Sequence, residues 1–464
     1  MGIKKYIGDR KFYKTLLIIA LPIILQNGVT NFVSLLDNIM VGQVGTEQMS
    51  GVAIVNQLIF VFNLCVFGGV SGAGIFTAQF FGSGDMHGVQ QTLRFKLYIC
   101  AAAAVLFITV FIVCGDNLIS LYLHEAENSG NLEATMDYGR RYLRVMLFGL
   151  APYALCNAYA STLRETGHTV LPMTAGIAAV CVNLVFNWLL IFGNLGFPTL
   201  GVEGAAIATV ISRYVEFAIV AIWAHTHKSV VPFIRGTYKS LRIDGALIKK
   251  IAVKGAPLLV NELLWSIGMT SITQCYSMRG LTAVAAVNIS STLSNLFNTI
   301  LLAMGNSVAI IVGNMLGANE MEKARDTDRK LIATSVVVCT FIGVIVFITA
   351  HLFPQIYNTN DDVRALAAVF LRISACVMPV QALNHCCYFT LRSGGKTIIT
   401  FIFDSAFVCC ICLPPAFILS HFTGISVILI YAVVQALEIV KSAVGIILVK
   451  KGVWLNNIVQ PSAA

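Results

Sequence analysis

Long apolar blocks recur along this chain and are separated by short polar segments. A helix of about 20 apolar residues crosses the hydrocarbon of a bilayer, and the blocks reach or exceed that length. Inside a bilayer the backbone must pair its polar groups within the segment, which a helix does. We therefore predict an all-α integral membrane protein with twelve transmembrane helices, at residues 16–41, 52–81, 93–114, 141–163, 170–193, 201–224, 250–276, 283–316, 331–353, 366–391, 397–419 and 424–449.

The charges are few and unevenly distributed. Only 11% of the 464 residues are charged, 57% are hydrophobic, and the mean hydropathy is +0.81. Most of the 31 Lys and Arg residues fall on one side of the predicted membrane, above all in residues 4–14 and 225–254, whereas segment 115–139 on the other side is acidic. Since cytoplasmic loops are the positive ones, we expect a cell-membrane protein with both termini in the cytoplasm. The net charge of +9 is therefore explained by the topology of a protein in a bilayer, and we expect no nucleic-acid partner.

The chain contains two copies of one unit. A shift of 235 residues places 22–85 on 257–320 without a gap, and a shift of 228 places Thr162-Leu-Arg-x-x-Gly-x-Thr169 on Thr390-Leu-Arg-x-x-Gly-x-Thr397. Each copy holds six predicted spans, an even number, so the two six-helix repeats are parallel in the membrane, as in several transporter folds. We predict an N-terminal lobe (1–224), a cytoplasmic connector (225–254) and a C-terminal lobe (255–464).

Pro22 and Pro257 occupy matching points in the first helix of each repeat. Proline removes a backbone donor and kinks a helix. Each proline would therefore act either as a hinge or as a static kink in its helix.

The chain resembles the multidrug and toxin extrusion (MATE) family along nearly its whole length. The resemblance rests on Pro22 with Asp37 in Ser34-Leu-Leu-Asp37, the two Thr-Leu-Arg turns, Asn183-x-x-x-Asn187, and Gly201-Val-Glu-Gly-Ala-Ala-Ile-Ala-Thr209. It implies a V-shaped pair of six-helix lobes that exports bulky, often cationic organic compounds in exchange for Na⁺ or H⁺. We expect a monomer that is not an enzyme and that needs no cofactor or metal beyond the coupling ion.

Asp37 has no Lys or Arg within a helical turn, so a proton or a cation would have to neutralise it. Asn183 and Asn187 share one helix face. Their amide oxygens, the Thr209 hydroxyl and the Asp37 carboxylate would form an oxygen cage for Na⁺. In the family, positions matching these four line a cation site. The alternative is that the amides and the hydroxyl only tie helices together.

The other polar residues within predicted spans divide by their neighbours. Arg213 with Glu216, and Glu438 with Lys441, are three residues apart and are predicted to form structural ion pairs. Glu262 shares a face with Trp265, and an acid beside an aromatic ring suits an organic cation or a proton. Trp265 and Gln381 stand where one branch of the family keeps acids. The resemblance therefore does not carry a second cation site over to the C-terminal lobe.

Three further residues within the predicted spans are candidates for contact with substrate or protons: Asp404, Asn157 and His385. Asp404 lacks a local partner, so it would serve a proton path or face cytoplasmic water. His385 matches Asn157 in the repeat, and it would carry protons or act as a neutral hydrogen-bonding group.

Two other transporter classes compete with the efflux interpretation. The sequence has no phosphate-binding Gly-x-x-x-x-Gly-Lys-Ser/Thr loop, so ATP is not expected as the direct energy source. A lipid-linked oligosaccharide flippase would need several basic residues in its cavity, whereas we place only Arg213 and Lys441 at membrane depth, each near a Glu. A carrier of the major facilitator type would need inverted three-helix repeats in each half.

Overall fold

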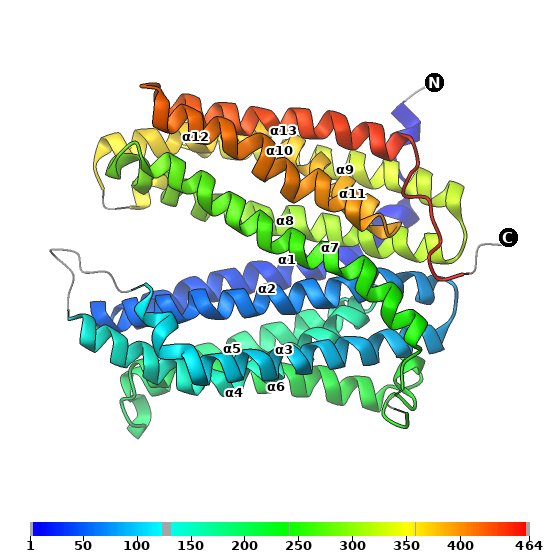
Figure 1. Ribbon diagram of the computed structural model, residues 1–464, viewed down its shortest axis with the longest axis horizontal. Coiled ribbons are helices and arrows are strands. Elements are labelled where there is room, and N and C mark those ends of the chain that lie inside the picture. The colour runs from blue at the N-terminus through cyan, green and yellow to red at the C-terminus, as the bar shows by residue number, and fades with distance from the viewer. Residues whose placement is uncertain (1–2, 123–130, 241, 358, 461–464) are drawn as a thin grey trace. The chain divides into compact units, whose positions relative to one another are not determined.

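The computed structural model describes residues 3–122, 131–240, 242–357 and 359–460, so residues 123–130 of the predicted acidic segment lie outside it. Within these ranges all regular elements are helices (Figure 1). The α-helices are α1 (Arg10–Gly42), α2 (Thr46–Gly82), α3 (Met86–Ser120), α4 (Leu132–Glu165), α5 (Val170–Phe192), α6 (Val202–Thr226), α7 (Gly245–Ser277), α8 (Leu281–Gly317), α9 (Met321–Thr349), α10 (Asp361–Ser393), α11 (Thr397–Phe401), α12 (Leu413–Phe422) and α13 (Val427–Lys450).

The eleventh predicted span is a composite helix. Two π-helical segments, η5 (Ile402–Ala406) and η6 (Val408–Cys412), join α11 to α12 without a break in the helical path. Four short 3₁₀ segments complete the described elements: η1 (Ile3–Tyr6), η2 (Asn194–Gly196), η3 (Pro232–Ile234) and η4 (Phe353–Ile356).

Ten described helices, counting Thr397–Phe422 as one, are long and apolar enough to cross a membrane. Two more, α4 and α7, have 34 and 33 residues but carry several charges in their first turns. The described part of the chain thus holds the twelve long helical segments expected, two of them less apolar than the rest.

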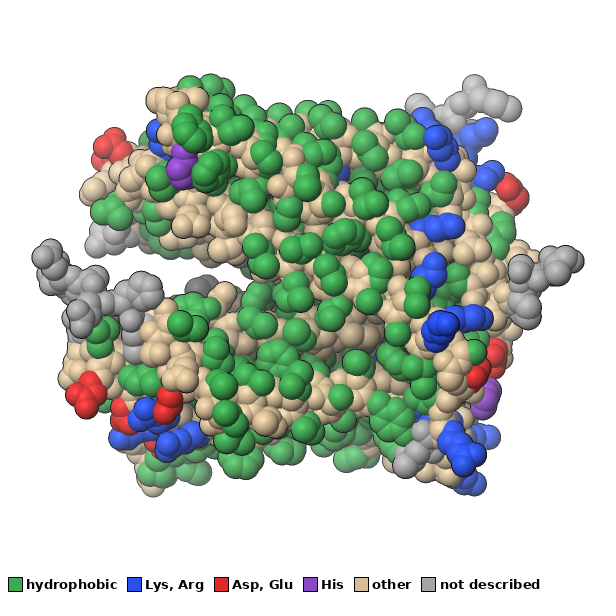
Figure 2. Space-filling view, in the orientation of Figure 1, with side chains coloured by type: hydrophobic (Ala, Val, Ile, Leu, Met, Phe, Trp, Pro, Cys, Tyr) green, Lys and Arg blue, Asp and Glu red, His purple; other side chains and the backbone are tan. Residues whose placement is uncertain are grey.

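Apolar side chains cover the outer faces of the helices. In α3, Leu106, Ile112 and Val113 are 60%, 67% and 73% exposed, which suits a surface that meets lipid rather than water. Figure 2 shows hydrophobic side chains along the helices and charged side chains gathered near helix ends. The composition of the surface therefore agrees with the predicted bilayer.

The chain forms two compact units. Unit 1 comprises residues 1–24, 78–84 and 250–464, and unit 2 comprises residues 25–77 and 85–249. Unit 1 therefore takes in the first turns of α1 and the last turns of α2, which the sequence placed with the N-terminal half. Pro22 lies just before the point at which α1 passes from unit 1 to unit 2.

In unit 2, the core is built from α2 to α6, and the connector folds against it. Arg94, at the start of α3, is buried and donates to three connector carbonyls, those of Thr237 (2.7 Å), Gly236 (3.0 Å) and Arg242 (3.2 Å). Phe233 and Ile234 of the connector are also buried. The connector is thus a folded part of unit 2.

In unit 1, the end of α2 crosses the end of α8 at two glycines that the 235-residue shift superimposes. A Cβ on Gly82 would lie 1.9 Å from the carbonyl oxygen of Asn314, and one on Gly317 would lie 1.9 Å from that of Gln79. The same shift places Gln79 on Asn314, so each repeat supplies the same two positions to one backbone crossing.

The C-terminal tail of the chain completes this crossing. The fully buried side chain of Gln79 donates to the carbonyls of Ser393 (2.9 Å) and Asn456 (3.1 Å) and accepts from the backbone N–H of Ile458 (2.8 Å). Trp454 is also fully buried. The tail therefore belongs to the core of unit 1.

Candidate cation site and the charged network

The four residues predicted to form a cation site come together in unit 2. Asp37 lies near the end of α1, Asn183 and Asn187 lie on one buried face of α5, and Thr209 lies in the second turn of α6. Asn187 Nδ2 donates to Asp37 Oδ1 at 2.6 Å and to Asn183 Oδ1 at 3.2 Å. Asn183 Nδ2 donates to Thr209 Oγ1 at 3.3 Å. Three helices thus contribute to one polar cluster.

The Asn183 amide can lie in two orientations, because its oxygen and nitrogen exchange places when the group turns over. In the second orientation its nitrogen donates to both Asp37 oxygens, at 2.9 and 3.1 Å, and its oxygen accepts from Thr209 at 3.3 Å. In the first orientation an amide oxygen faces the carboxylate at those short distances. Two such oxygens repel each other unless a positive charge lies between them.

Another oxygen of the cluster is available. Oδ1 of Asn187 is buried, and among the described residues it accepts no hydrogen bond. A buried polar atom without a partner is costly. Oxygen donors are also the ligands that hard cations prefer. The donor set of Asp37, Asn183, Asn187 and Thr209 therefore fits a Na⁺ ion, and its carboxylate also fits a proton.

Asp37 forms no ion pair in the described part of the chain. The basic residue that acts on it electrostatically, Arg213, is held elsewhere: its Nη1 lies 3.3 Å from Glu216 Oε2, and its guanidinium lies 5.0 Å from the centre of the Tyr153 ring. The structure thus has the Arg213–Glu216 contact that the sequence predicts.

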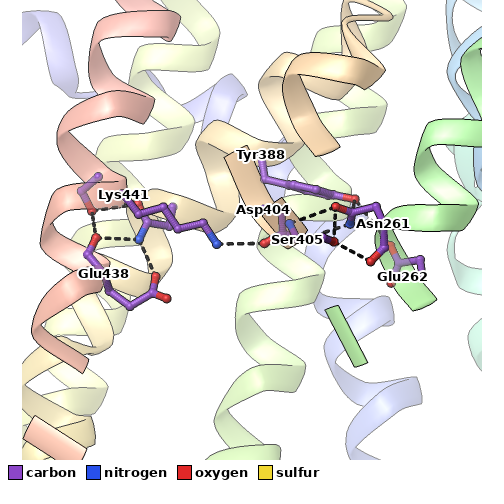
Figure 3. Close-up of polar contacts among 9 residues, drawn as sticks. Asn261, Glu262, Tyr388, Asp404, Ser405, Glu438 and Lys441 are labelled. Atoms are coloured by element: carbon purple, nitrogen blue, oxygen red, sulfur yellow. Dashed lines mark hydrogen bonds and ion pairs between the residues drawn. The ribbon is translucent and has the colours of Figure 1, made fainter. Parts of the chain in front are cut away.

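A second polar network lies in unit 1 (Figure 3). Asp404, from the π-helical segment η5, receives the Lys441 ammonium of α13 at 2.8 Å on Oδ1. Its Oδ2 accepts from Asn261 Nδ2 of α7 at 3.0 Å. Asp404, which has no local partner in the sequence, thus receives its partners from two other helices.

The predicted pairing of Lys441 with Glu438 is not the one in the structure. Glu438 Oε2 instead accepts from Asn384 Nδ2 of α10 at 2.7 Å, and Asn384 Oδ1 accepts from Ser442 at 2.8 Å. Spacing along one helix favours a neighbour three residues away, but the carboxylate of Asp404 approaches Lys441 from another helix.

Asn261 joins the two parts of this network. Its amide nitrogen donates to Asp404, and its amide oxygen accepts from the backbone N–H of Ser405 (3.2 Å) and from the Ser405 hydroxyl (2.6 Å). Adjacent residues of an α-helix point in different directions, and here the π-helical turn presents both Asp404 and Ser405 to one side chain. Such turns are frequent at functional sites.

Glu262 is partly buried beside this network. Tyr388 donates its hydroxyl to Glu262 Oε1 at 3.5 Å and accepts from Asn261 at 3.3 Å, while Arg392 acts on Glu262 electrostatically. Trp265, one turn along α7, is 36% exposed. Glu262 and Trp265 are thus three residues apart on α7, and a role of the pair in binding a cation stays a prediction.

The remaining predicted residues have local partners or lie within helices. Gln381 donates to Gln435 at 3.3 Å, and Asn157 donates to the Tyr153 carbonyl at 2.9 Å. His385 lies on α10 and is acted on electrostatically by Lys441, Asp404 and Glu438. Pro22 and Pro257 lie inside α1 and α7.

Sequence reasoning missed a buried ion pair in unit 2. The ammonium of Lys96, whose side chain is fully buried in α3, pairs with Glu165 at the end of α4, and Ser161 and Thr162 accept from it at 3.2 Å each. It also missed Asn261, Ser405 and Asn384. A signal existed for Lys96 alone, since it is a Lys near the start of an apolar block.

A helical protein built from two parallel repeats, with carboxylates held by amides and a lysine inside its helices, is a membrane transporter in class. The family model for MatE matches residues 22–189 and again residues 257–418, beginning at Pro22 and at Pro257. The chain belongs to this family, multidrug and toxin extrusion, and it is a multi-pass membrane protein and not an enzyme.

Curated relatives span nearly the whole chain. It is 21% identical over 417 residues to the probable multidrug resistance protein YoeA of Bacillus subtilis, covering 90% of this chain and 89% of the relative. It is 23% identical over 451 residues to the probable multidrug resistance protein NorM of Thermotoga maritima, covering 95% and 93%.

Solved structures share the fold. A MATE protein in the straight conformation matches with a TM-score of 0.85 at 19% identity, over 97% of both chains. The Vibrio cholerae MATE transporter VcmN matches with a TM-score of 0.84 at 21% identity, over 95% of this chain and 97% of that one. The all-α fold and the family predicted from the sequence are thereby confirmed.

Proposed function

We propose that this protein exports bulky organic compounds, many of them cationic, in exchange for Na⁺ or H⁺, and that Asp37, Asn183, Asn187 and Thr209 hold the coupling ion. The curated relatives are described as multidrug resistance proteins, which supports an efflux role. The observation that carries the coupling site is the Asp37 cluster, a carboxylate surrounded by amides and a hydroxyl on three helices.

The cluster supports exchange because Na⁺ and H⁺ can both neutralise Asp37. The amide and hydroxyl oxygens of the cluster are ligands that suit Na⁺, and the carboxylate alone suffices for a proton. An ion that binds one conformation of the protein better than another shifts the protein toward that conformation.

The charge of the substrate is proposed to be sensed at Glu262 and Trp265. A partly buried acid with an aromatic ring one turn away attracts a cation by charge and by the ring quadrupole. A flippase for pyrophosphate-linked lipids is not favoured, because Arg213 and Lys441 each have a carboxylate partner already.

Efflux from proteoliposomes tests the proposal. Purified protein is reconstituted, a fluorescent cationic dye is loaded, and an inward Na⁺ gradient and an inward pH gradient are imposed separately. One of the two gradients should drive efflux without ATP, since each charge crossing 100 mV supplies about 2.3 kcal/mol. Efflux that needs ATP and persists after both gradients are collapsed would contradict the antiport mechanism.

A further inference from the structure

The two units place their acids at positions that the repeat does not relate. The 235-residue shift puts Asp37 on Ile272, and the 228-residue shift puts Asp404 on Gly176. The geometry agrees with the second assignment, because Asn261 hydrogen-bonds Asp404 in unit 1 and its counterpart Gln26 lies against Gly176 in unit 2. Each unit thus has its own carboxylate in its own surroundings.

The surroundings of Asp404 form an ammonium-binding site. The Lys441 ammonium lies 2.8 Å from Asp404 Oδ1, and also 5.4 Å and 6.0 Å from the ring centres of Phe403 and Phe407. A carboxylate with aromatic rings is the chemistry by which proteins recognise alkylammonium groups. The side chains of Lys441 and Asp404 are only 8% and 18% exposed, so little water screens the pair.

The basic residue of unit 2 has a different position and a different partner. Arg213 precedes Glu216 by three residues, whereas Lys441 follows Glu438 by three. Arg213 stays with Glu216, and Asp37 is left with amide partners. In unit 1, Asn384 holds Glu438, and Lys441 extends to Asp404 instead.

From this contrast we infer that Lys441 is a tethered cation that fills, from within, a cation site in unit 1. Its ammonium excludes exchangeable cations from Asp404, both by occupying the carboxylate and by repelling a second positive charge. Exchange of a cation is then confined to unit 2. This inference rests on the proposed coupling at Asp37, but the occupied site can be tested without transport.

Chemical rescue provides that test. Lys441→Ala removes the ammonium and its alkyl chain, which leaves Asp404 buried without a counter-ion and space for a small amine. The thermal unfolding temperature of the purified protein is measured against increasing propylammonium chloride, with n-propanol as the uncharged analogue. Propylammonium should stabilise the Lys441→Ala protein saturably and well above the effect of n-propanol, and it should not do so in the wild type.

The matched control is the double variant Lys441→Ala/Asp404→Asn, which lacks both charges and should lose the response to propylammonium. If Lys441→Ala alone gives no folded protein, the yield of monodisperse protein solubilised with and without propylammonium becomes the measurement, and it should rise only with the amine. An equal response to propylammonium in the wild type and in both variants would overturn the inference, as would an absence of any response in Lys441→Ala.

The outcome for transport is separate. Normal gradient-driven efflux by the Asp37→Asn protein would reject coupling at Asp37 and leave the propylammonium result intact. Conversely, saturable binding of Na⁺ by an Asp37→Asn protein, abolished by Asp404→Asn, would show that Lys441 does not close the site in unit 1.

Discussion

Asp37 is the residue whose replacement tests the cation site most directly. Asp37→Asn keeps the shape and removes the charge, so the protein should fold as well as the wild type or better, because an ionisable group leaves the membrane interior. Gradient-driven dye efflux should fall to the level of protein-free liposomes. Asp362→Asn, which removes an exposed acid in the first turn of α10, is the control and should transport normally. A well-folded Asp37→Asn protein with normal efflux would make Asp37 a structural residue.

Glu262→Gln should change which compounds leave rather than whether the cycle runs. The substitution removes the negative charge beside Tyr388 and Trp265 but keeps a hydrogen-bonding group. Efflux of cationic dyes should weaken about tenfold, the equivalent of about 1.4 kcal/mol, while efflux of uncharged compounds changes less. Paired initial rates for one cationic and one neutral dye decide this, and an equal loss for both would place Glu262 outside substrate recognition.

At this scale the sequence predicts contacts well when spacing along one helix determines them. Spacing places Asn183 and Asn187 on one face of α5, and Arg213–Glu216 follows from i, i+3 spacing, whereas the expectation that Asp37 and Thr209 line the same site came from the family resemblance. The pairing of Lys441 does not follow, because its partner arrives from a π-helical turn, and a change of helical period leaves no pattern in the residues. The roles of Asn261 and Lys96 depend in the same way on which helices become neighbours.

Among the elements, α3 and α4 are clamped by the buried Lys96–Glu165 pair. Lys96→Met should destabilise the protein by about 3–5 kcal/mol, since it leaves Glu165 as a mostly buried charge without a partner. Lys96→Met/Glu165→Leu should recover most of that loss, because replacing both members of a buried pair is often neutral. Thermal unfolding of the purified variants measures both. Equal destabilisation by the single and double changes would mean that packing, and not charge, sets the effect.

At the crossing of α2 and α8, the two helices are too close for any side chain larger than that of glycine. Gly317→Ala places a methyl group 1.9 Å from a backbone carbonyl, so the helix ends must separate. We expect a clear drop in unfolding temperature. Gly28→Ala in α1 is the matched control, because its Cβ would meet nothing within 4 Å and alanine favours a helix over glycine by about 1 kcal/mol. A Gly317→Ala protein as stable as Gly28→Ala would show that the crossing is loose.

For the whole molecule, the fold alone does not test the predicted membrane topology, that is, which segments face the cytoplasm. Thr199, in the segment between α5 and α6, and Ser240, in the connector, are both exposed. If the positive segments are cytoplasmic, a cysteine at Thr199 should react with an impermeant maleimide in intact cells, and one at Ser240 only after permeabilisation. The unmodified chain gives the background from its own cysteines, and labelling of both sites from outside would invert or break the predicted topology.

The overall architecture was accessible from the sequence because hydropathy and a 235-residue repeat are chain-long signals. What the repeat does not reveal is that the compact units cut across it, with the ends of α1 and α2 packed into unit 1. The end of α2 meets α8 through close backbone contacts at Gly82 and Gly317, and the start of α1 packs there through Leu16, Ile19 and Ile23. Glycines are common in apolar blocks, and their positions in the sequence do not show which of them another helix will approach.

The capture of Gln79 by the C-terminal tail also has a consequence for biosynthesis. The ribosome makes Gln79 long before its partners, because the carbonyls of Ser393 and Asn456 and the N–H of Ile458 follow it by 314, 377 and 379 residues. The side chain of Gln79 therefore stays without these hydrogen bonds during most of the synthesis of the chain. A chain that stops before Trp454 lacks two of the three partners and leaves the amide at the end of α2 incompletely hydrogen-bonded.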